Sequence, residues 1–187
     1  MKHQSLIYSI GYGNRKINEF IDLLKKFHIL YLVDVRTQPY SKFNPCFNQS
    51  DLKFALENQG IKYVYMGDTL GGRPANPSCY DKEGKVDYEM VKSKDFFKSG
   101  IFRLKAAHEK NLSIVIMCSE INPLECHRSK LIGRVLLDDN IHIRHIDEKD
   151  RIKSQIDVIN ELNKGLPDTS LFPQEVILNK TSRKSYL

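Results

Sequence analysis

The sequence predicts one α/β domain, with an open, mostly parallel, twisted sheet of about five strands flanked by helices. Short apolar runs alternate with segments of helical period, which is typical of strand–helix units around a parallel sheet. The chain has 187 residues, 41% of them hydrophobic, which is enough for one core and short for two. We expect a domain over residues 1–165 and a C-terminal tail or arm over residues 166–187.

The strands are predicted from five apolar runs. Residues 113–117 are the most apolar run and therefore belong at the centre of the sheet. The other runs are followed by Gly, Pro or Asn or by the start of a helical pattern, which limits their length. These four strands are expected at residues 6–10, 30–35, 61–66 and 142–146.

The helices are predicted from apolar residues at a spacing of three and four. Ser50, Asn122 and Asp147 are the expected N-caps of three of them, and Glu125 fits a capping box three residues after Asn122. A break is expected near Gly100. The predicted helices cover residues 18–27, 50–59, 88–110, 122–137 and 147–163. The long loop between them, residues 67–84, is of a length typical of functional loops.

Composition excludes several classes of protein. No stretch reaches the ~20 apolar residues of a membrane-crossing helix, and the N-terminus lacks the apolar run of a secretory signal, so we expect a cytoplasmic protein. Four scattered cysteines do not form a disulfide framework and are expected to be reduced thiols. The formal net charge of +6 favours an anionic partner without selecting nucleic acid.

The candidate site lies where the loops after the parallel strands meet. Ligands of open parallel sheets bind outside the carboxyl ends of the strands. Residues from several predicted strand ends therefore converge, although they are far apart in the chain. The expected substrate-binding residues are Gly11, Tyr12, Asn14, Asp34, Arg36, Gly71, Gly72, Arg73 and Arg128, and the expected catalytic residues are Cys118, Glu120, Cys126 and His127.

The chemistry of these residues points to an anion. The positive end of the helix after Asn122 suits a phosphate or carboxylate, and Arg36 and Arg128 could hold it by bidentate contacts. The same field favours a thiolate at Cys118 or Cys126, with Glu120 or His127 handling a proton. Simpler interpretations stay open, because Asp34 and Arg36 could form a structural ion pair and Cys118 could be a buried apolar residue.

A metal site is the other chemical option. Cys118, Cys126 and His127 could bind zinc as three ligands, and Cys46 or Cys79 could add a fourth. The chain lacks the close cysteine pairs of a structural zinc site, so the cofactor is left unknown, with zinc or another divalent metal as an option and no metal ligand assigned.

The predicted tail contains a further motif. The segment 168–172 resembles the short peptide by which bacterial proteins bind the replication sliding clamp, through Leu171 and Phe172. The alternative is a tail that packs these two apolar side chains on its own domain.

Four ordered blocks of sequence resemble one known family. The blocks are Ser9-Ile10-Gly11-Tyr12-Gly13-Asn14, Leu32-Val33-Asp34-Val35-Arg36 with Pro39, Leu70-Gly71-Gly72, and Cys118-Ser119-Glu120 with Pro123 and Cys126-His127-Arg128. They resemble the signature blocks of the uncharacterised prokaryotic family called domain of unknown function 488. The resemblance spans about residues 5–147 and implies one α/β domain with a shared site at these blocks. Similar members carry His-Ser at Tyr12-Gly13 and Ser-Arg at Ser41-Lys42.

Three functions follow from these patterns. The first is an enzyme, a hydrolase or transferase with a thiol nucleophile, that acts on a phosphate-bearing nucleotide or nucleic acid. The second is a non-catalytic nucleic-acid-binding or adaptor protein. The third is a metal-dependent hydrolase.

Overall fold

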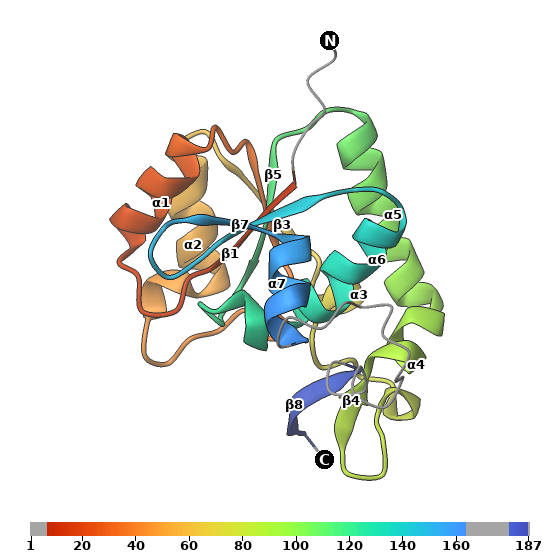
Figure 1. Cartoon of the computed structure of the whole chain (residues 1–187). Helices are drawn as coiled ribbons and strands as arrows, with labels where there is room; N and C mark the ends of the chain where they lie inside the picture. The colour runs from red at the N-terminus through yellow and green to blue at the C-terminus, as the bar shows by residue number, and fades with distance from the viewer. Residues whose placement is uncertain (1–6, 164–179, 187) are drawn as a thin grey trace.

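A six-stranded sheet forms the centre of the computed structural model, which describes residues 7–163 and 180–186. The strand order is β3-β2-β5-β1-β6-β7, and the predicted α/β class is confirmed. Helices α1 and α2 cover one face of the sheet, and α5 and α6 cover the other (Figure 1). None of the helices in the described part of the chain is long and apolar enough to cross a membrane.

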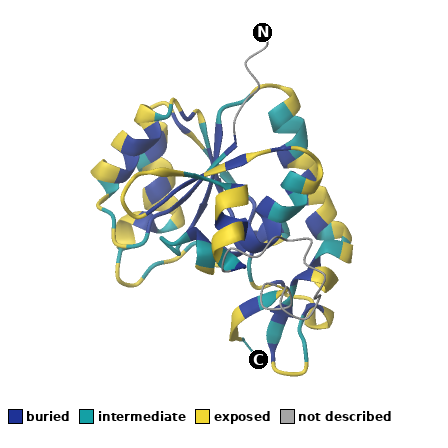
Figure 2. Ribbon diagram, viewed as in Figure 1, coloured by how far each residue is buried: buried dark blue, intermediate teal, exposed yellow. Residues whose placement is uncertain are grey.

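The five predicted strands are present and pair in parallel. They are β1 (Ile7–Gly11), β2 (Tyr31–Asp34), β3 (Lys62–Tyr65), β5 (Ile114–Cys118) and β6 (Ile143–Ile146). All of β5 is buried, and its residues alternate between the two core clusters on opposite faces of the sheet. Figure 2 shows the same pattern, with dark blue strands inside and exposed outer helix faces. This burial on both faces explains why the run is apolar throughout.

A sixth strand was not predicted. Strand β7 (Ile152–Ser154) is only three residues long and pairs antiparallel with β6 at the sheet edge. The helix predicted from Asp147 therefore begins later, as α7 (Gln155–Leu162), with Ser154 as its N-cap. Asp147 instead accepts backbone hydrogen bonds from Lys149 and Arg151 in the preceding turn.

The remaining helices differ from the prediction at their ends. The helix predicted over residues 88–110 is divided at Lys94, not near Gly100, because Gly100 lies inside α5 where Leu70 packs closely on it. Asn48, rather than Ser50, is the N-cap residue of α2. The helices are α1 (Ile17–Lys26), α2 (Gln49–Glu57), α3 (Gly67–Leu70), α4 (Tyr88–Ser93), α5 (Asp95–Glu109) and α6 (Arg134–Asp138).

The helix predicted over residues 122–137 is three pieces. A 3-10 turn η3 (Pro123–Glu125) begins at Asn122 and ends at an extended Cys126. A π-helix η4 (Arg128–Gly133) follows and continues as α6. The hydroxyl of Ser129 donates to the carbonyls of Pro123 and Cys126, which ties the turn to the π-helix. The prediction of one regular helix was therefore wrong, and Cys126 lies between two helical pieces.

A second, small sheet joins distant parts of the chain. Strand β4 (Lys85–Asp87) pairs antiparallel with β8 (Thr181–Ser185), beside the segment predicted as a loop (Figure 1). That loop itself contains α3 and a 3-10 turn η2 (Pro77–Cys79). The predicted boundary at residue 165 and the pair Leu171 and Phe172 lie outside the described residues.

A buried polar chain links β1, β6, α7 and the π-helix. The ring of His145 lies 2.5 Å from the Ser9 hydroxyl through Nδ1 and 2.6 Å from Gln155 Oε1 through Nε2. Gln155 donates its amide to the Ser129 carbonyl at 3.0 Å, so its oxygen accepts from the imidazole. His145 is therefore neutral, accepting from Ser9 and donating to Gln155. Burial, together with the charge of Arg128, lowers its pKa to about 3.

This histidine makes stability depend on pH. The unfolded chain binds a proton at His145 below the ordinary histidine pKa of 6.5, whereas the folded protein binds it only near pH 3. We expect His145 to add up to ~1.4 kcal/mol per pH unit to the loss of unfolding free energy as the pH falls below 6.5. Urea unfolding of His145→Gln should show a shallower dependence than the wild type. His142→Gln, at an exposed position beside β6, is the control; equal slopes in all three proteins would contradict the prediction.

Candidate functional site

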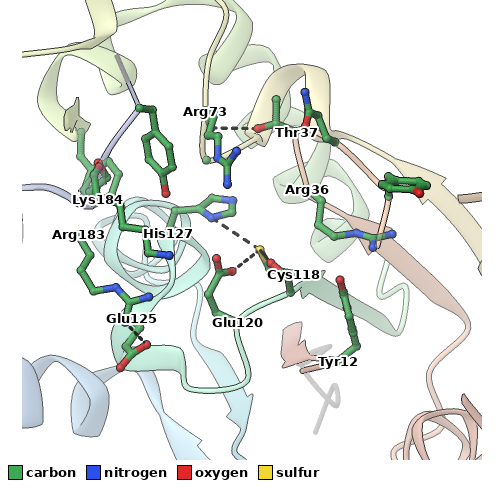
Figure 3. Close-up of a pocket in the computed structure, with 17 residues that line it drawn as sticks. Tyr12, Arg36, Thr37, Arg73, Cys118, Glu120, Glu125, His127, Arg183 and Lys184 are labelled. Carbon is green, nitrogen blue, oxygen red and sulfur yellow. Dashed lines mark hydrogen bonds and ion pairs between the residues drawn. The ribbon is translucent and has the colours of Figure 1, made fainter. Parts of the chain in front are cut away.

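A pocket of about 280 Å³ opens at the carboxyl ends of β1, β2 and β5. Parts of the chain that are remote in sequence line it, including the segment after β2, the Gly72–Arg73 turn, the segment after β5, and β8 (Figure 3). The expected convergence of loops at this edge of the sheet is thus observed. The lining residues are Tyr12, Arg36, Thr37, Gln38, Tyr40, Gly72, Arg73, Tyr88, Cys118, Ser119, Glu120, Glu125, His127, Ser182, Arg183, Lys184 and Tyr186.

Two sulfur atoms, a carboxylate and an imidazole meet at the base of this pocket. The Cys118 thiol donates to Glu120 Oε2 at 2.8 Å, and Cys126 Sγ lies 3.4 Å from the same oxygen. His127 Nδ1 lies 3.9 Å from Cys118 Sγ and 3.7 Å from Cys126 Sγ. We call these four residues the sulfur cluster.

The sulfur cluster is held by tight backbone packing. The guanidinium of Arg128 donates to the carbonyls of Glu120 and Ile121, which fixes the turn after β5. A Cβ atom at Gly11 would lie 1.9 Å from the Glu120 carbonyl oxygen, and one at Gly72 would lie 2.7 Å from His127 Nδ1. Both positions therefore require glycine because the backbone approaches its neighbour too closely for a side chain.

Burial and neighbouring charges set the protonation of the sulfur cluster. The neighbouring Cys126 side chain and full burial raise the pKa of Cys118 well above its usual value, so its thiol keeps its proton. Burial opposes ionisation of Glu120, but the Cys118 hydrogen bond and the charge of His127 outweigh it and lower the Glu120 pKa to about 2. Burial lowers the pKa of His127, but the interactions with Cys118 and Glu120 outweigh burial and raise it. The resting cluster is a thiol, a carboxylate and an imidazole that favours its charged form.

Cations surround the pocket entrance. Arg73 and Lys184 have no acidic partner among the described residues, whereas Arg183 pairs with Glu125. The Arg73 guanidinium lies 4.5 Å from the centre of the Tyr186 ring, which limits its orientation. Figure 3 shows Arg73 and His127 directed toward the space beside Cys118 and Glu120. Arg73, Arg183 and Lys184 form what we call the cationic rim.

Arg36 lines the pocket but is already paired. It forms a buried bidentate ion pair with Asp34, with an Nη2–Oδ2 distance of 2.6 Å. Asp34 also accepts a hydrogen bond from the Tyr63 hydroxyl at 2.7 Å. The guanidinium carbon of Arg36 lies 5.2 Å from the centre of the Tyr12 ring, and its Nη1 has no hydrogen-bond partner within residues 7–163 and 180–186. One donor therefore stays free, although the ion pair neutralises most of the charge.

The sequence of residues 16–135 matches the family described as "Domain of unknown function DUF488". This chain belongs to that family. The resemblance predicted from the four sequence blocks is thus confirmed. No curated protein and no solved structure matches the chain significantly.

The family match covers only part of the candidate site in this chain. Glu120, Cys126 and His127 lie inside the matched residues, as does Arg73. Tyr12 and the two cations of β8 lie outside them. This member of the family therefore completes its cationic rim with a C-terminal strand that the family match does not include.

About half of the predicted site residues line the pocket. Seven do so: Tyr12, Arg36, Gly72, Arg73, Cys118, Glu120 and His127. The others are placed nearby without lining it, since Asp34 faces Arg36, Asn14 is exposed beyond β1, and Cys126 lies at the buried side of the sulfur cluster. Gly11 and Gly71 are buried in backbone contacts.

Arg128 differs most from its predicted role. It was predicted to hold an anion, but its side chain is fully buried and donates to two backbone carbonyls behind the pocket. The helix end expected to bind an anion does not form at Pro123 either, because η3 is a single 3-10 turn. The structure therefore gives Arg128 a positioning role.

The residues that sequence reasoning missed come mainly from β8. Ser182, Arg183, Lys184 and Tyr186 line the pocket but lie inside the segment 166–187 that was predicted as a tail. The only signal for them was an Arg-Lys pair beside a tyrosine near the C-terminus. Nothing in the local pattern connected that pair with the sheet edge.

The thiols should differ in reactivity. Cys46 is exposed, whereas Cys118 and Cys126 are buried and the pKa of Cys118 is raised. Because the thiolate is the reactive form, we expect iodoacetamide to label Cys46 at least ~10-fold faster than Cys118 in the reduced protein at pH 8. Peptide mass spectrometry of a time course measures each rate, with buried Cys79 as the reference for burial alone. Equal rates at Cys46 and Cys118 would contradict this protonation state.

Proposed function

We propose that this DUF488 protein is an enzyme acting on an anionic, phosphate-bearing substrate, a nucleotide or a nucleic-acid end. One observation carries the proposal: the cationic rim and three members of the sulfur cluster, Cys118, Glu120 and His127, line the same pocket. Binding groups for an anion and groups able to transfer a proton are thus within one ligand's reach of each other.

Charge supports binding of an anion. Arg73 and Lys184 are the rim cations without an acidic partner among the described residues, and Arg183 is paired only at the exposed side chain of Glu125. A guanidinium held against an aromatic ring loses little further freedom on binding a phosphate. The volume of about 280 Å³ lies at the small end of ligand pockets, which favours one phosphate-bearing unit over a duplex.

The chemistry assigned to the pocket is proton transfer by Glu120 and His127. Glu120 is a carboxylate at rest and is the proton acceptor. His127, whose pKa is raised, either donates a proton or stabilises the negative charge that develops on the substrate. Cys118 keeps its proton, which makes it a weak nucleophile in this arrangement. Water or a substrate hydroxyl is therefore the better attacking group, and hydrolysis or group transfer is the reaction class.

A second candidate is a nucleic-acid-binding protein without catalysis. Tyr40 on the pocket edge is 69% exposed, and Phe43 in the same loop is 96% exposed beside Lys42. Exposed aromatic rings next to cations are the features on which single-stranded nucleic acids stack. Phe43→Ala should then weaken binding of a short single-stranded oligonucleotide that shows no turnover. Retention of full binding by this variant would remove the candidate.

The rim arginines test the proposed binding. We expect Arg73→Ala and Arg183→Ala each to weaken binding of pyrophosphate or ADP about 10-fold or more, because each removes a charge-assisted hydrogen bond worth roughly 1.5–3 kcal/mol. Isothermal titration calorimetry at low salt measures the affinities. Arg103→Ala, at an exposed arginine on α5 outside the pocket, is the matched control. Binding that is unchanged in both rim variants would refute the anion site.

The proposed proton acceptor has its own test. Glu120→Gln keeps the shape of the side chain but removes its charge, so we expect turnover of a phosphate-bearing substrate to fall roughly 100-fold or more while anion affinity changes little. A panel of nucleotides and 5′-phosphorylated oligonucleotides, with phosphate release as the readout, supplies the substrate. Glu109→Gln, at an exposed position on α5 outside the pocket, is the control. Equal loss in both variants would refute the role of Glu120.

A further inference from the structure

We propose that the sulfur cluster is a zinc site, with Cys118, Cys126 and His127 as ligands and Glu120 beside a fourth position that opens to the pocket. The sulfur atoms of the two cysteines and a ring nitrogen of His127 all lie within 4.8 Å of one another. All three residues are buried, and Cys118 and His127 line the pocket together with Glu120. The metal would therefore occupy the base of the pocket rather than the protein surface.

The distances agree with tetrahedral coordination. Ligand atoms bound to zinc at ~2.0–2.3 Å lie roughly 3.4–3.8 Å from each other across a tetrahedron. Here the sulfur–nitrogen separations are 3.9 and 3.7 Å, and Cys126 Sγ lies 3.4 Å from Glu120 Oε2. The two sulfur–nitrogen separations thus need to change by only a few tenths of an ångström. The Cys118–Glu120 separation of 2.8 Å is shorter because it is a thiol–carboxylate hydrogen bond, which metal binding would replace.

The backbone around the ligands is already arranged. Cys126 is extended between the 3-10 turn and the π-helix, so Cys126 and His127 approach the cluster from successive positions. The backbone N–H of Arg128 points at Cys126 Sγ at 3.5 Å, as it would toward a thiolate ligand. Gly72 lies directly against the His127 ring and fixes its position.

The donor set selects the metal. Two thiolates and an imidazole are soft and borderline ligands that suit zinc, whereas magnesium and calcium prefer oxygen. Three protein ligands with a fourth position open to a pocket are typical of catalytic zinc.

The sequence spacing disfavoured zinc because the chain lacks a close cysteine pair. The fold instead brings Cys118 from the end of β5 to Cys126, with Glu120, not Cys46 or Cys79, nearest the fourth position.

A catalytic role for the bound metal rests on the proposed function and would extend it. The zinc ion would polarise a water or a substrate oxygen beside Glu120, and the two sulfurs would act as ligands instead of nucleophiles. The binding of metal itself does not depend on any substrate.

Metal titration of the purified, reduced full-length chain tests this inference. After removal of metals with a chelator, we expect one equivalent of Zn²⁺ or Co²⁺ to bind, with sulfur-to-cobalt charge-transfer and tetrahedral d–d absorption for Co²⁺. Plasma mass spectrometry of the desalted protein gives the stoichiometry. Cys118→Ser and Cys126→Ser should each weaken binding more than about 100-fold, since loss of a mere supporting residue typically costs roughly 10–100-fold.

Matched variants separate the outcomes. Cys46→Ser and Cys79→Ser remove one exposed and one buried thiol outside the cluster and should leave metal binding unchanged. Circular dichroism establishes that each variant folds, and wild-type protein treated with iodoacetamide after Zn²⁺ addition should show both cluster thiols protected. Less than about 0.1 equivalent bound by the wild type, or equal binding by Cys126→Ser, would overturn the zinc site.

The two proposals fail separately. Metal binding by a protein whose rim variants bind pyrophosphate as the wild type does would support zinc and reject the anion site. Anion binding that depends on Arg73 and Arg183, in a protein that holds no metal, would do the reverse.

Discussion

The hydrogen bonds from Arg128 to the turn after β5 are the constraint on which the site depends. A fully buried guanidinium is costly unless it is well paired, and here two backbone carbonyls, of Glu120 and Ile121, accept from it. These hydrogen bonds fix the backbone at Glu120, and the turn packs directly against Gly11. The cluster of sulfur, carboxylate and imidazole exists because this turn cannot relax toward solvent.

The second constraint is the irregular helix that carries Cys126 and His127. A regular α-helix that began at Pro123 would have placed Cys126 and His127 at successive positions around its first turns. The π-helix and the extended Cys126 instead direct both side chains to Cys118. Gly133 permits this packing because a side chain there would meet Gln155, which belongs to the buried chain through His145. π-helices are frequent at functional sites, and this one places two chemically active side chains.

Electrostatics divide the pocket into two parts. Its base holds groups that control each other's protonation, with Glu120 ionised and Cys118 protonated. Its rim holds exposed cations, which come from the turn after α3 and from β8. A phosphate-bearing ligand with its charge at the rim would present its reacting atoms to the base. The same base, where two sulfurs and one imidazole nitrogen lie within 4.8 Å of one another, is where a zinc ion would be held.

Local pattern alone determined the fold class, the five parallel strands and the central place of residues 114–118, because burial on both faces demands an uninterrupted apolar run. It also determined that Cys118, Glu120 and His127 follow a strand end and so belong at one edge of the sheet. Tertiary structure decided the rest. Tertiary contacts determine the π-helix, the burial of the Arg128 side chain and the position of the β8 cations at the pocket. A local sequence pattern does not contain information about such contacts.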